Sequence, residues 1–474
     1  MKDSIEKYEE RMRDGREVYY RGQKVEDVTK HPVLALATNF YKNVLELYKD
    51  EEVKKMLFVN DPTYGEITRF FQAPKSSQDL IKRSDLTTEL TRRTGHLYAH
   101  IGSDMLFALT IIANKVGKEY AERMRKFGEH IIKTEPVLAG AQMDVKGDRG
   151  LRPSQQADLD LHLRVVEERD DGIIVNGAKA HTSNSCVSDE LIVLPGRMMI
   201  KGEEEFAFGF AIPINTKGLK MICRPVLESE GRMHPLETPR VGHAAVVETT
   251  TIFDRVFVPW ERVFVYRDPK AAGALANLFA LFHRFSAVSY RAALSEIILG
   301  CAKLMAEYNG LDKVGYINEK VASIVNFTEI QRLCIRMSAY ECQYDKITGI
   351  AMPNPLHANI GKLYSNNNYM SAVQSMIDVA GGIAITAPSG DDYDNPELKK
   401  YIDKYYAGKA SVPAGNRFKL ALFIREIVAL MAGMDSVSMI HAEGSIVASI
   451  LALYRTYDFG PSIKTVKRMA SITD

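Results

Sequence analysis

The sequence has few cysteines, almost no net charge and no long apolar run free of charged residues. None of its five cysteines belongs to a Cys-x-x-Cys pair or another short ligand spacing, so no cysteine-built metal or iron–sulfur site is expected. A formal net charge of +1 gives no overall field that would recruit nucleic acid or an anionic bilayer. The longest apolar stretches, such as 420–434, are interrupted by charges and predict buried helices rather than membrane spans.

Other absences narrow the class further. Residues 1–7 contain no apolar segment of the kind a signal peptide needs, so we expect a cytoplasmic protein. No Gly-x-Gly-x-x-Gly follows a predicted strand near the N-terminus, which excludes a Rossmann nucleotide-binding domain. No internal repeat or low-complexity linker is present. With 474 residues, 46% of them hydrophobic, the chain has room for two or three packed layers of an ordinary globular protein.

The spacing of apolar residues divides the chain into three regions. Residues 1–140 carry helical spacings, and Ser84-Asp85 is predicted to cap a long helical run. Residues 141–270 carry short strands, among them a hairpin that turns at 169–172. Such closely spaced strands favour a small barrel or sandwich.

Helical spacings return in residues 271–474. Four long stretches suit a four-helix bundle: 271–308, 312–347, 355–380 and 416–456. Because no linker separates the three regions, we expect them to pack as one unit.

Two polar segments of the strand-rich region are candidates for cofactor contact. In 142–149 a glycine turn can present backbone N–H groups to a cofactor, although a plain polar connector would look the same. In 176–184 the pair Asn176-Gly177 predicts a hairpin turn, followed by small polar residues that suit a flat heterocycle.

With these motifs the chain resembles the acyl-CoA dehydrogenase-like flavoprotein family of 4-hydroxybutyryl-CoA dehydratase and 4-hydroxyphenylacetate 3-monooxygenase, over residues 90–455. The resemblance implies an α+β fold: an N-terminal helical domain, a middle small β-barrel and a C-terminal four-helix bundle. It also implies non-covalent FAD and a homotetramer. By resemblance, the residues that line the flavin are Gln142, Met143, Asp144, Lys146, His181, Thr182 and Ser183, with Gly381 and Gly382 approaching the dinucleotide from a neighbouring subunit.

Three histidines form a second candidate constellation. His96 and His100 are four residues apart in a helical stretch, so both imidazoles can lie on one helix face. Taken alone, each is more readily explained as an ordinary helix histidine. His283 opens a third segment of the same resemblance, and spacing alone does not bring it to the first two.

The resemblance brings these positions together. In the dehydratase branch, two cysteines four residues apart, a histidine and a further cysteine hold an iron–sulfur cluster. Here His96 and His100 stand at the first two cysteines, His283 at the histidine and Tyr290 at the last cysteine. Because such a cluster needs thiolates, we expect no iron–sulfur cluster. Two alternatives stay open: a hydrogen-bonded polar patch, or a mononuclear Zn or Fe ion held by these four side chains.

Further positions of the resemblance bear on catalysis. Ala287 and Arg291 replace a tyrosine and a lysine, and Ser438 stands where an acidic residue is expected, with Glu443 close by. Glu248 matches a family active-site glutamate, although an exposed strand residue is an equally simple explanation. The candidate acid–base residues are His283 and Glu248.

The resulting hypothesis is an FAD-dependent enzyme that acts on a small acyl substrate, a CoA thioester. Double-bond isomerisation or a dehydratase- or dehydrogenase-like reaction fits a flavin beside an acid–base pair. The alternative is a two-component monooxygenase, which takes reduced FAD from a flavin reductase and hydroxylates an aromatic substrate. The run 101–105 lacks the arginine and tyrosine of that branch, which counts against it. A flavin-carrying scaffold without activity is a third interpretation.

Overall fold

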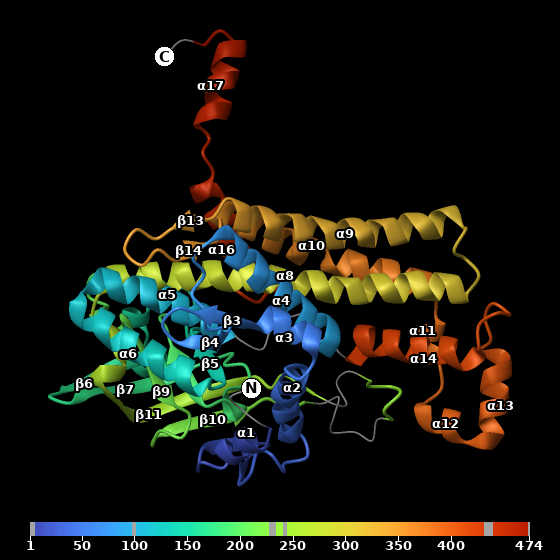
Figure 1. Ribbon diagram of the computed structural model, residues 1–474, viewed down its shortest axis with the longest axis horizontal. Helices are drawn as coiled ribbons and strands as arrows, with labels where there is room; N and C mark the ends of the chain where they lie inside the picture. The colour runs from blue at the N-terminus through green and yellow to red at the C-terminus, as the bar shows by residue number, and fades with distance from the viewer. Residues whose placement is uncertain (1–4, 97–100, 227–233, 240–243, 431–438, 473–474) are drawn as a thin grey trace.

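The structure is a computed structural model that describes residues 5–96, 101–226, 234–239, 244–430 and 439–472. Figure 1 shows a strand-rich region beside a bundle of long helices, with a further group of short helices under the far end of the bundle. The last helix, α17 (Gly460–Met469), projects away from the body.

Two sheets make up the strand-rich region. The six-stranded sheet has the order β2 (Gln23–Val25), β1 (Glu17–Tyr20), β10 (Leu219–Cys223), β11 (Thr249–Pro259), β7 (Gly172–Lys179) and β6 (Arg164–Arg169). The four-stranded sheet has the order β12 (Val263–Tyr266), β9 (Phe208–Pro213), β8 (Glu190–Val193) and β5 (Leu138–Ala141).

The two sheets share one apolar core, and among the described residues they do not close into a barrel. Val175 and Phe253 of the larger sheet belong to the same buried cluster as Val193 and Phe210 of the smaller one. Each sheet keeps two edge strands, so the described residues form a sandwich joined by a single bridge between Asp144 and Lys179, and the predicted small barrel is not confirmed. The alternation of apolar residues is the same in both architectures, so only the pairing distinguishes them.

Two turn predictions in this region have different outcomes. The hairpin at 169–172 is confirmed, because Arg169 pairs with Gly172 where β6 meets β7. The predicted Asn176-Gly177 turn is wrong, because β7 continues to Lys179 and pairs with β11. A Cβ at Gly177 would lie 2.8 Å from the carbonyl oxygen of His162, so glycine is needed there to let the two chain segments approach closely.

The bundle is built on three long helices, α8 (Pro269–Tyr308), α9 (Gly315–Tyr340) and α10 (Pro355–Ala380), which pack on one another. The ranges predicted for the first and third are confirmed to within two residues. Two further helices, α4 (Ser77–Thr94) and α5 (Ile101–Val116), cover α8 on the side of the sheets. The N-cap of α4 is Ser76 rather than the predicted Ser84, because the Ser76 hydroxyl accepts from the Asp79 N–H at 3.1 Å.

The predicted fourth helix, 416–456, is wrong as a single element. The chain forms α14 (Ala414–Arg425), continues as a π-helical turn at Glu426–Leu430, and resumes as α16 (Ile446–Thr456). The segment 441–445 is irregular and contains Gly444 at φ +93°. Of α14 and α16, only α16 packs extensively on α10, so the break redirects the chain across the bundle.

The remaining elements are short. They are α1 (Ile5–Arg11), α2 (Leu34–Leu47), α3 (Glu51–Leu57), β3 (Phe58–Asp61), β4 (Gly65–Thr68), α6 (Lys118–Thr134), β13 (Gln343–Tyr344), β14 (Ala351–Met352), α11 (Ile383–Thr386), α12 (Gly390–Asp394) and α13 (Pro396–Tyr405). Among the described residues, α8 alone is long and apolar enough by composition to cross a membrane, and 61% of its most apolar window is buried within the protein. That burial is typical of a core helix of a bundle.

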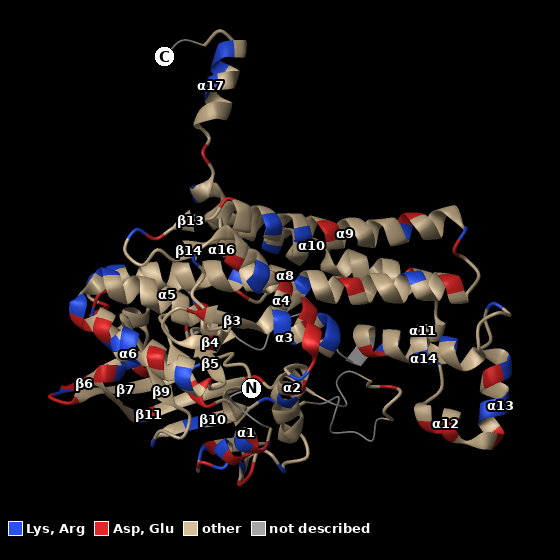
Figure 2. Cartoon of the chain, in the orientation of Figure 1, with Lys and Arg blue, Asp and Glu red and all other residues tan. Residues whose placement is uncertain are grey.

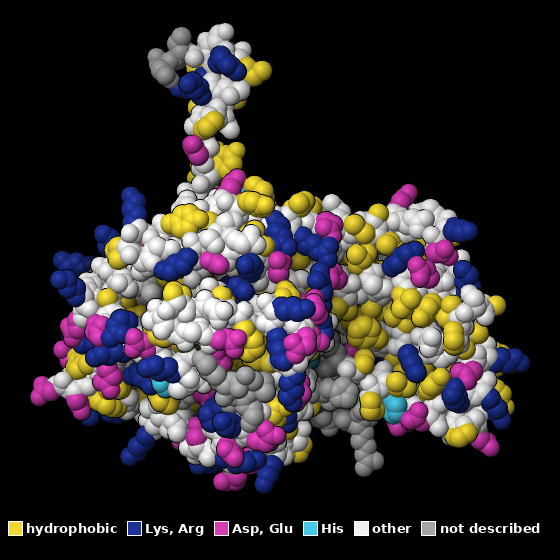
Figure 3. All heavy atoms as spheres, in the orientation of Figure 1, with side chains coloured by type: hydrophobic (Ala, Val, Ile, Leu, Met, Phe, Trp, Pro, Cys, Tyr) yellow, Lys and Arg dark blue, Asp and Glu magenta, His cyan; other side chains and the backbone are white. Residues whose placement is uncertain are grey.

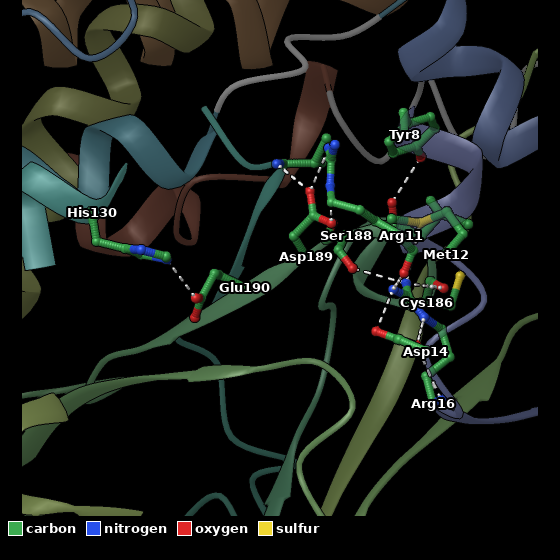
Figure 4. A network of polar contacts seen from close by, with 12 residues as sticks. Tyr8, Arg11, Met12, Asp14, Arg16, His130, Cys186, Ser188, Asp189 and Glu190 are labelled. Carbon is green, nitrogen blue, oxygen red and sulfur yellow. Dashed lines mark hydrogen bonds and ion pairs between the residues drawn. The ribbon is translucent and has the colours of Figure 1, made fainter. Parts of the chain in front are cut away.

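The N-terminal region is not purely helical, because β1 and β2 extend the six-stranded sheet. Beside them, α1 is fastened to the loop 185–189 (Figure 4). The Tyr8 hydroxyl donates to the Val187 carbonyl at 2.8 Å, and Arg16 donates to the Ser188 carbonyl at 2.8 Å. Arg11 pairs with Asp189 at 2.9 Å. This network holds the chain directly after the 181–183 segment.

Candidate functional site

A buried ion pair organises the first candidate flavin segment. Lys179 Nζ lies 2.7 Å from Asp144 Oδ1, and both side chains are almost fully buried. Lys179 also donates to the carbonyl oxygens of Gln142 and Leu194 at 3.0 Å each. Although burial disfavours its charge, the attraction of Lys179 and of His162 keeps the pKa of Asp144 below its ordinary value. Asp144 therefore fixes the local backbone.

The neighbouring residues of this segment join the two sheets and α8. The Ala180 N–H donates to the Met143 carbonyl at 2.8 Å, and the Gln142 side chain donates to the Ala276 carbonyl of α8 at 3.4 Å. Lys146 has φ +80°, and burial, with the nearby Arg149, lowers the pKa of its ammonium group. A left-handed lysine is uncommon and marks a chain held in a specific loop shape.

The second segment forms a tight polar corner after β7. His181 has φ +56° and is exposed, whereas Thr182 is buried. The Thr182 hydroxyl donates to the Thr249 carbonyl of β11 at 3.0 Å. Next to it, the Ser183 hydroxyl donates to Glu248 Oε1 at 2.7 Å. The corner thus exposes His181, while Ser183 is half-buried against Glu248 and Thr182 anchors the turn.

Glu248 is a half-buried residue whose carboxylate has unused hydrogen-bonding capacity. Its Oε2 atom is buried and has no hydrogen-bond partner among the described residues. Burial raises the pKa of Glu248 above its ordinary value, despite the hydrogen bond from Ser183. An orphaned buried acceptor beside an exposed polar corner fits a site that receives the polar edge of a ligand.

These observations fit a flavin at the corner. Exposed and half-buried polar groups of 142–146 and 181–183 converge there, and the Glu248 oxygen lacks a partner among the described residues.

Gly381 and Gly382 are exposed, and a Cβ added at either would meet no described atom within 4 Å, so their backbone is open to a pyrophosphate. They lie at the end of α10 beside α11, away from the sheets in Figure 1.

A second group of polar side chains lies on α8. His283 and Tyr290 are seven residues apart, which places them on one face of the helix, about 10 Å apart. One further heptad towards the N-terminus, the backbone carbonyl of Ala276 accepts from the Gln142 side chain, so the same helix also contacts the flavin segment. His283 also stacks on Phe279, with ring centroids 5.2 Å apart.

His283 lies between two buried carboxylates. Its Nδ1 atom is 3.4 Å from Asp104 Oδ2 of α5, and its Nε2 atom is 3.9 Å from Glu443 Oε1. Asp104 is held in turn by Arg83 at 2.9 Å and by the Ser286 hydroxyl at 2.9 Å. A carboxylate at Nδ1 favours the tautomer with its proton there, which leaves Nε2 as the basic atom.

Glu443 is held by three side chains of α8. The Tyr290 hydroxyl donates to its Oε1 atom at 2.6 Å, and Arg291 donates to its Oε2 atom. Burial and the charge of Glu443 raise the pKa of Tyr290 well above its ordinary value, so the phenol stays protonated. Arg284 holds the backbone of the same residue, donating to the Glu443 carbonyl at 3.1 Å.

The histidine constellation is only partly assembled in the described residues. His283 and Tyr290 both approach Glu443 Oε1, whereas His96 is buried beside the ring of Phe40 at 5.6 Å between centroids. His100 lies outside the described residues. Among the residues that the structure describes, no group of three or more His, Cys, Asp or Glu side chains could hold a metal ion. The predicted metal site therefore receives no support, and the charged groups that the structure places beside His283 are the carboxylates of Asp104 and Glu443.

Sequence reasoning missed one member of this cluster and underrated another. Asp104 was not predicted as a site residue, because a single acidic residue in an apolar helix is most simply explained as an exposed position. Glu443 was predicted only as an acidic residue close to Ser438, which stands at the expected acidic position and lies outside the described residues. A signal for Glu443 exists in the sequence: Arg291 stands in an otherwise apolar helical stretch, and a buried arginine needs an acidic partner.

Comparison with known proteins places the chain among flavin enzymes of two kinds. Residues 5–265 match the family described as 4-hydroxyphenylacetate 3-hydroxylase N terminal, and residues 272–471 match its C-terminal counterpart. The chain is 29% identical to the 4-hydroxybutyryl-CoA dehydratase/vinylacetyl-CoA-Delta-isomerase of Clostridium aminobutyricum over 477 residues, which covers 96% of each chain. It is 28% identical to the 4-hydroxyphenylacetate 3-monooxygenase oxygenase component of Thermus thermophilus, covering 83% of this chain and 81% of the relative.

Solved structures agree with this placement. An oxygen-tolerant archaeal 4-hydroxybutyryl-CoA dehydratase from N. maritimus superposes with a TM-score of 0.93 at 27% identity, covering 100% of this chain and 96% of the other. The oxygenase component of 4-hydroxyphenylacetate 3-monooxygenase, complexed with FAD, has a TM-score of 0.90 at 24% identity and 98% coverage of both chains, which shows a shared fold.

Proposed function

The chain belongs to the 4-hydroxyphenylacetate 3-hydroxylase family, and from this membership we propose that it is an FAD-dependent enzyme acting on a small acyl-CoA thioester. The proposed reaction moves a proton and a double bond, as an isomerase or as a dehydratase- or dehydrogenase-like enzyme without an iron–sulfur cluster. The relative that covers 96% of both chains carries a dehydratase and isomerase name, which supports this class. We also propose that the protein is cytoplasmic.

The observation that carries the proposal is His283 between Asp104 and Glu443. The α-proton of a thioester is acidic enough for an imidazole that has been oriented by a carboxylate. Nε2 of His283 takes that proton, and the two buried carboxylates stabilise the imidazolium that results. The double bond shifts by one carbon, and a proton returned to the far carbon completes an isomerisation.

The other residues bind and orient. The corner formed by 181–183, with Asp144 and Lys179 beneath it, is proposed to hold the flavin, and Glu248 is proposed to receive a donor of the ligand through Oε2. When bound, FAD supplies a group that can accept hydride or an electron from the adjacent carbon atoms. The phenol of Tyr290 stays protonated and keeps Glu443 in place.

The test compares two reactions on the purified protein. Denaturation should release FAD, and under nitrogen the FAD-loaded protein should convert a short β,γ-unsaturated acyl-CoA to its conjugated isomer, which chromatography resolves. The competing monooxygenase function, suggested by relatives such as the Thermus thermophilus protein, predicts instead that reduced FAD, O₂ and a phenol give a catechol. Oxygen-dependent hydroxylation without thioester turnover would overturn the proposal. Protein that takes up no FAD would overturn both functions.

We further propose a homotetramer, because two features remain incomplete in a single chain. The end of α10, which carries Gly381 and Gly382, lies away from the sheets in Figure 1. In addition, α17 buries no residue, carries basic but no acidic residues (Figure 2), and exposes Val466 and Met469. Figure 3 shows apolar side chains along this projecting arm. A second copy of the chain would cover them.

Light scattering is expected to give about four times the 53.1 kDa of one chain. Truncation after Thr456, which removes the arm, is expected to yield smaller species and to weaken FAD binding. Replacing Lys464 and Lys467 with serine, which keeps the apolar surface, serves as the control. A flavin-loaded monomer of full length would contradict this prediction.

A further inference from the structure

Lys362 is a fully buried lysine in the N-terminal third of α10, on the side that meets α16. Its ammonium group donates to the Gly444 carbonyl and, at 3.1 Å, to the hydroxyl of Ser449. Ser449 is the one described residue of α16 that is buried. Lys362 therefore joins α10 to Gly444, which directly follows Glu443, and to Ser449 in α16.

The turn that Lys362 holds has an unusual backbone. Glu443 has φ +57° and Gly444 has φ +93°. A left-handed non-glycine residue costs about 1 kcal/mol or more and persists where surrounding contacts over-determine it. Three cationic side chains supply those contacts: Arg284 on the Glu443 carbonyl, Arg291 on its carboxylate and Lys362 on the next carbonyl.

From this arrangement we infer that Lys362 is a positioning residue, which latches the 443–444 turn to α10 and so keeps the Glu443 carboxylate against Tyr290 and His283. The inference rests on the proposed role of the His283 cluster. The contact from Arg291 is to the Glu443 carboxylate, at the end of a side chain that can rotate. Arg284 and Lys362 instead bind the successive carbonyl groups of Glu443 and Gly444, which holds the backbone in the conformation that directs the Glu443 side chain.

The charge environment makes this latch sensitive to pH. Burial lowers the pKa of Lys362 to about 7, with Glu443 opposing and Arg291 and Arg284 adding to the effect. These three are the charged groups that act on it, two from α8 and one from the turn. Hydrogen bonds from an ionised donor are roughly twice as strong as neutral ones, so the latch is tighter below pH 7.

The linked effect on stability has the opposite sign. Because the folded-state pKa lies below the ordinary value for lysine of about 10.4, the unfolded chain binds the extra proton between these two values. The contribution of Lys362 to the free energy of unfolding therefore rises as the pH increases from about 7 to about 10. Below pH 7 the ammonium is charged in the folded and in the unfolded chain, so this contribution no longer changes with pH.

The experiment compares the wild type with Lys362→Met and Ser449→Ala in the full-length, FAD-loaded protein. Lys362→Met is expected to lower kcat for the thioester at least tenfold with KM changed less than threefold, and to abolish the limb on which kcat falls as pH rises through about 7. Ser449→Ala should keep that limb, because Gly444 still receives the lysine. Lys320→Met, which removes the exposed contact with Asp378, is the matched control and should change neither.

Hydrogen exchange separates this inference from the proposed function. Without any substrate, Lys362→Met is expected to speed exchange in 443–456 at least tenfold relative to the wild type and to the Lys320→Met control. If the wild type has no thioester activity, the proposed function fails and the exchange result alone decides about the latch. Unchanged exchange in 443–456, or an unchanged kcat–pH profile in an active enzyme, would overturn the role of Lys362.

Discussion

Replacing His283 with glutamine is expected to lower kcat for thioester turnover by about 10²–10⁴-fold, the range that positioned general bases contribute. Glutamine can still reach Asp104 and Glu443 by hydrogen bonds, so the variant should fold and retain FAD. What it lacks is a basic nitrogen at the position of Nε2, 3.9 Å from the Glu443 carboxylate. Stopped-flow or steady-state assays, with FAD content measured on the same sample, check the result.

A surface histidine in a similar pairing provides the control for that prediction. His357 Nε2 lies 2.8 Å from Glu341, outside the cluster. His357→Gln should leave kcat unchanged within twofold. An equal loss of kcat in the two variants, or full activity of His283→Gln, would show that His283 is not the catalytic base. Glu248 would then become the leading candidate.

Replacing Lys179 with methionine is expected to destabilise the protein by about 3–5 kcal/mol, because it leaves the buried Asp144 carboxylate without its cation. The same change removes donors from the carbonyl groups of Gln142 and Leu194. Chemical denaturation measures the loss, and the double variant Asp144→Asn/Lys179→Met should recover part of it. FAD affinity should fall in the single variant, since the ion pair lies beneath the flavin corner.

The neighbouring pair Lys220–Asp254 offers a matched comparison. It joins β10 to β11 at 2.7 Å but is exposed, so Lys220→Met should destabilise the protein much less than Lys179→Met. The buried pair also predicts a pH dependence. Because the pKa of Asp144 is lowered in the folded state, its contribution is complete above the ordinary carboxyl pKa and is lost as the pH falls through the lower folded value. The Lys179→Met variant should lack that acid-induced loss, and a variant as stable as the wild type would refute the role of the pair.

Local chemistry accounts for the successful part of the sequence interpretation. The helices α8 and α10 follow from apolar residues at helical spacing and from polar caps such as Asn354, which accepts from the N–H of Leu356. The hairpin at 169–172 follows from its own turn residues. The family was identified from two short segments, and the match over 5–265 and 272–471 confirms it.

Signals that were ambiguous locally were resolved by distant contacts. Asn176-Gly177 satisfies the rule for a hairpin turn, yet it lies inside β7 because β11, more than seventy residues later, continues the pairing past it. Likewise, β1 joins the sheet by parallel pairing with β10, about two hundred residues away, and no local pattern reports such a partner.

By itself the sequence determined the family, the long helices and the residues that can do acid–base chemistry, because spacing and side-chain type are local properties. Tertiary structure alone decided which of those residues meet. It buried Asp144 against Lys179, turned Glu443 toward Tyr290 and His283, and surrounded His283 with carboxylates. Burial sets the cost of an unpaired charge, and burial depends on chain segments hundreds of residues apart. That physical dependence is why the cluster around Glu443 emerged only from the folded chain.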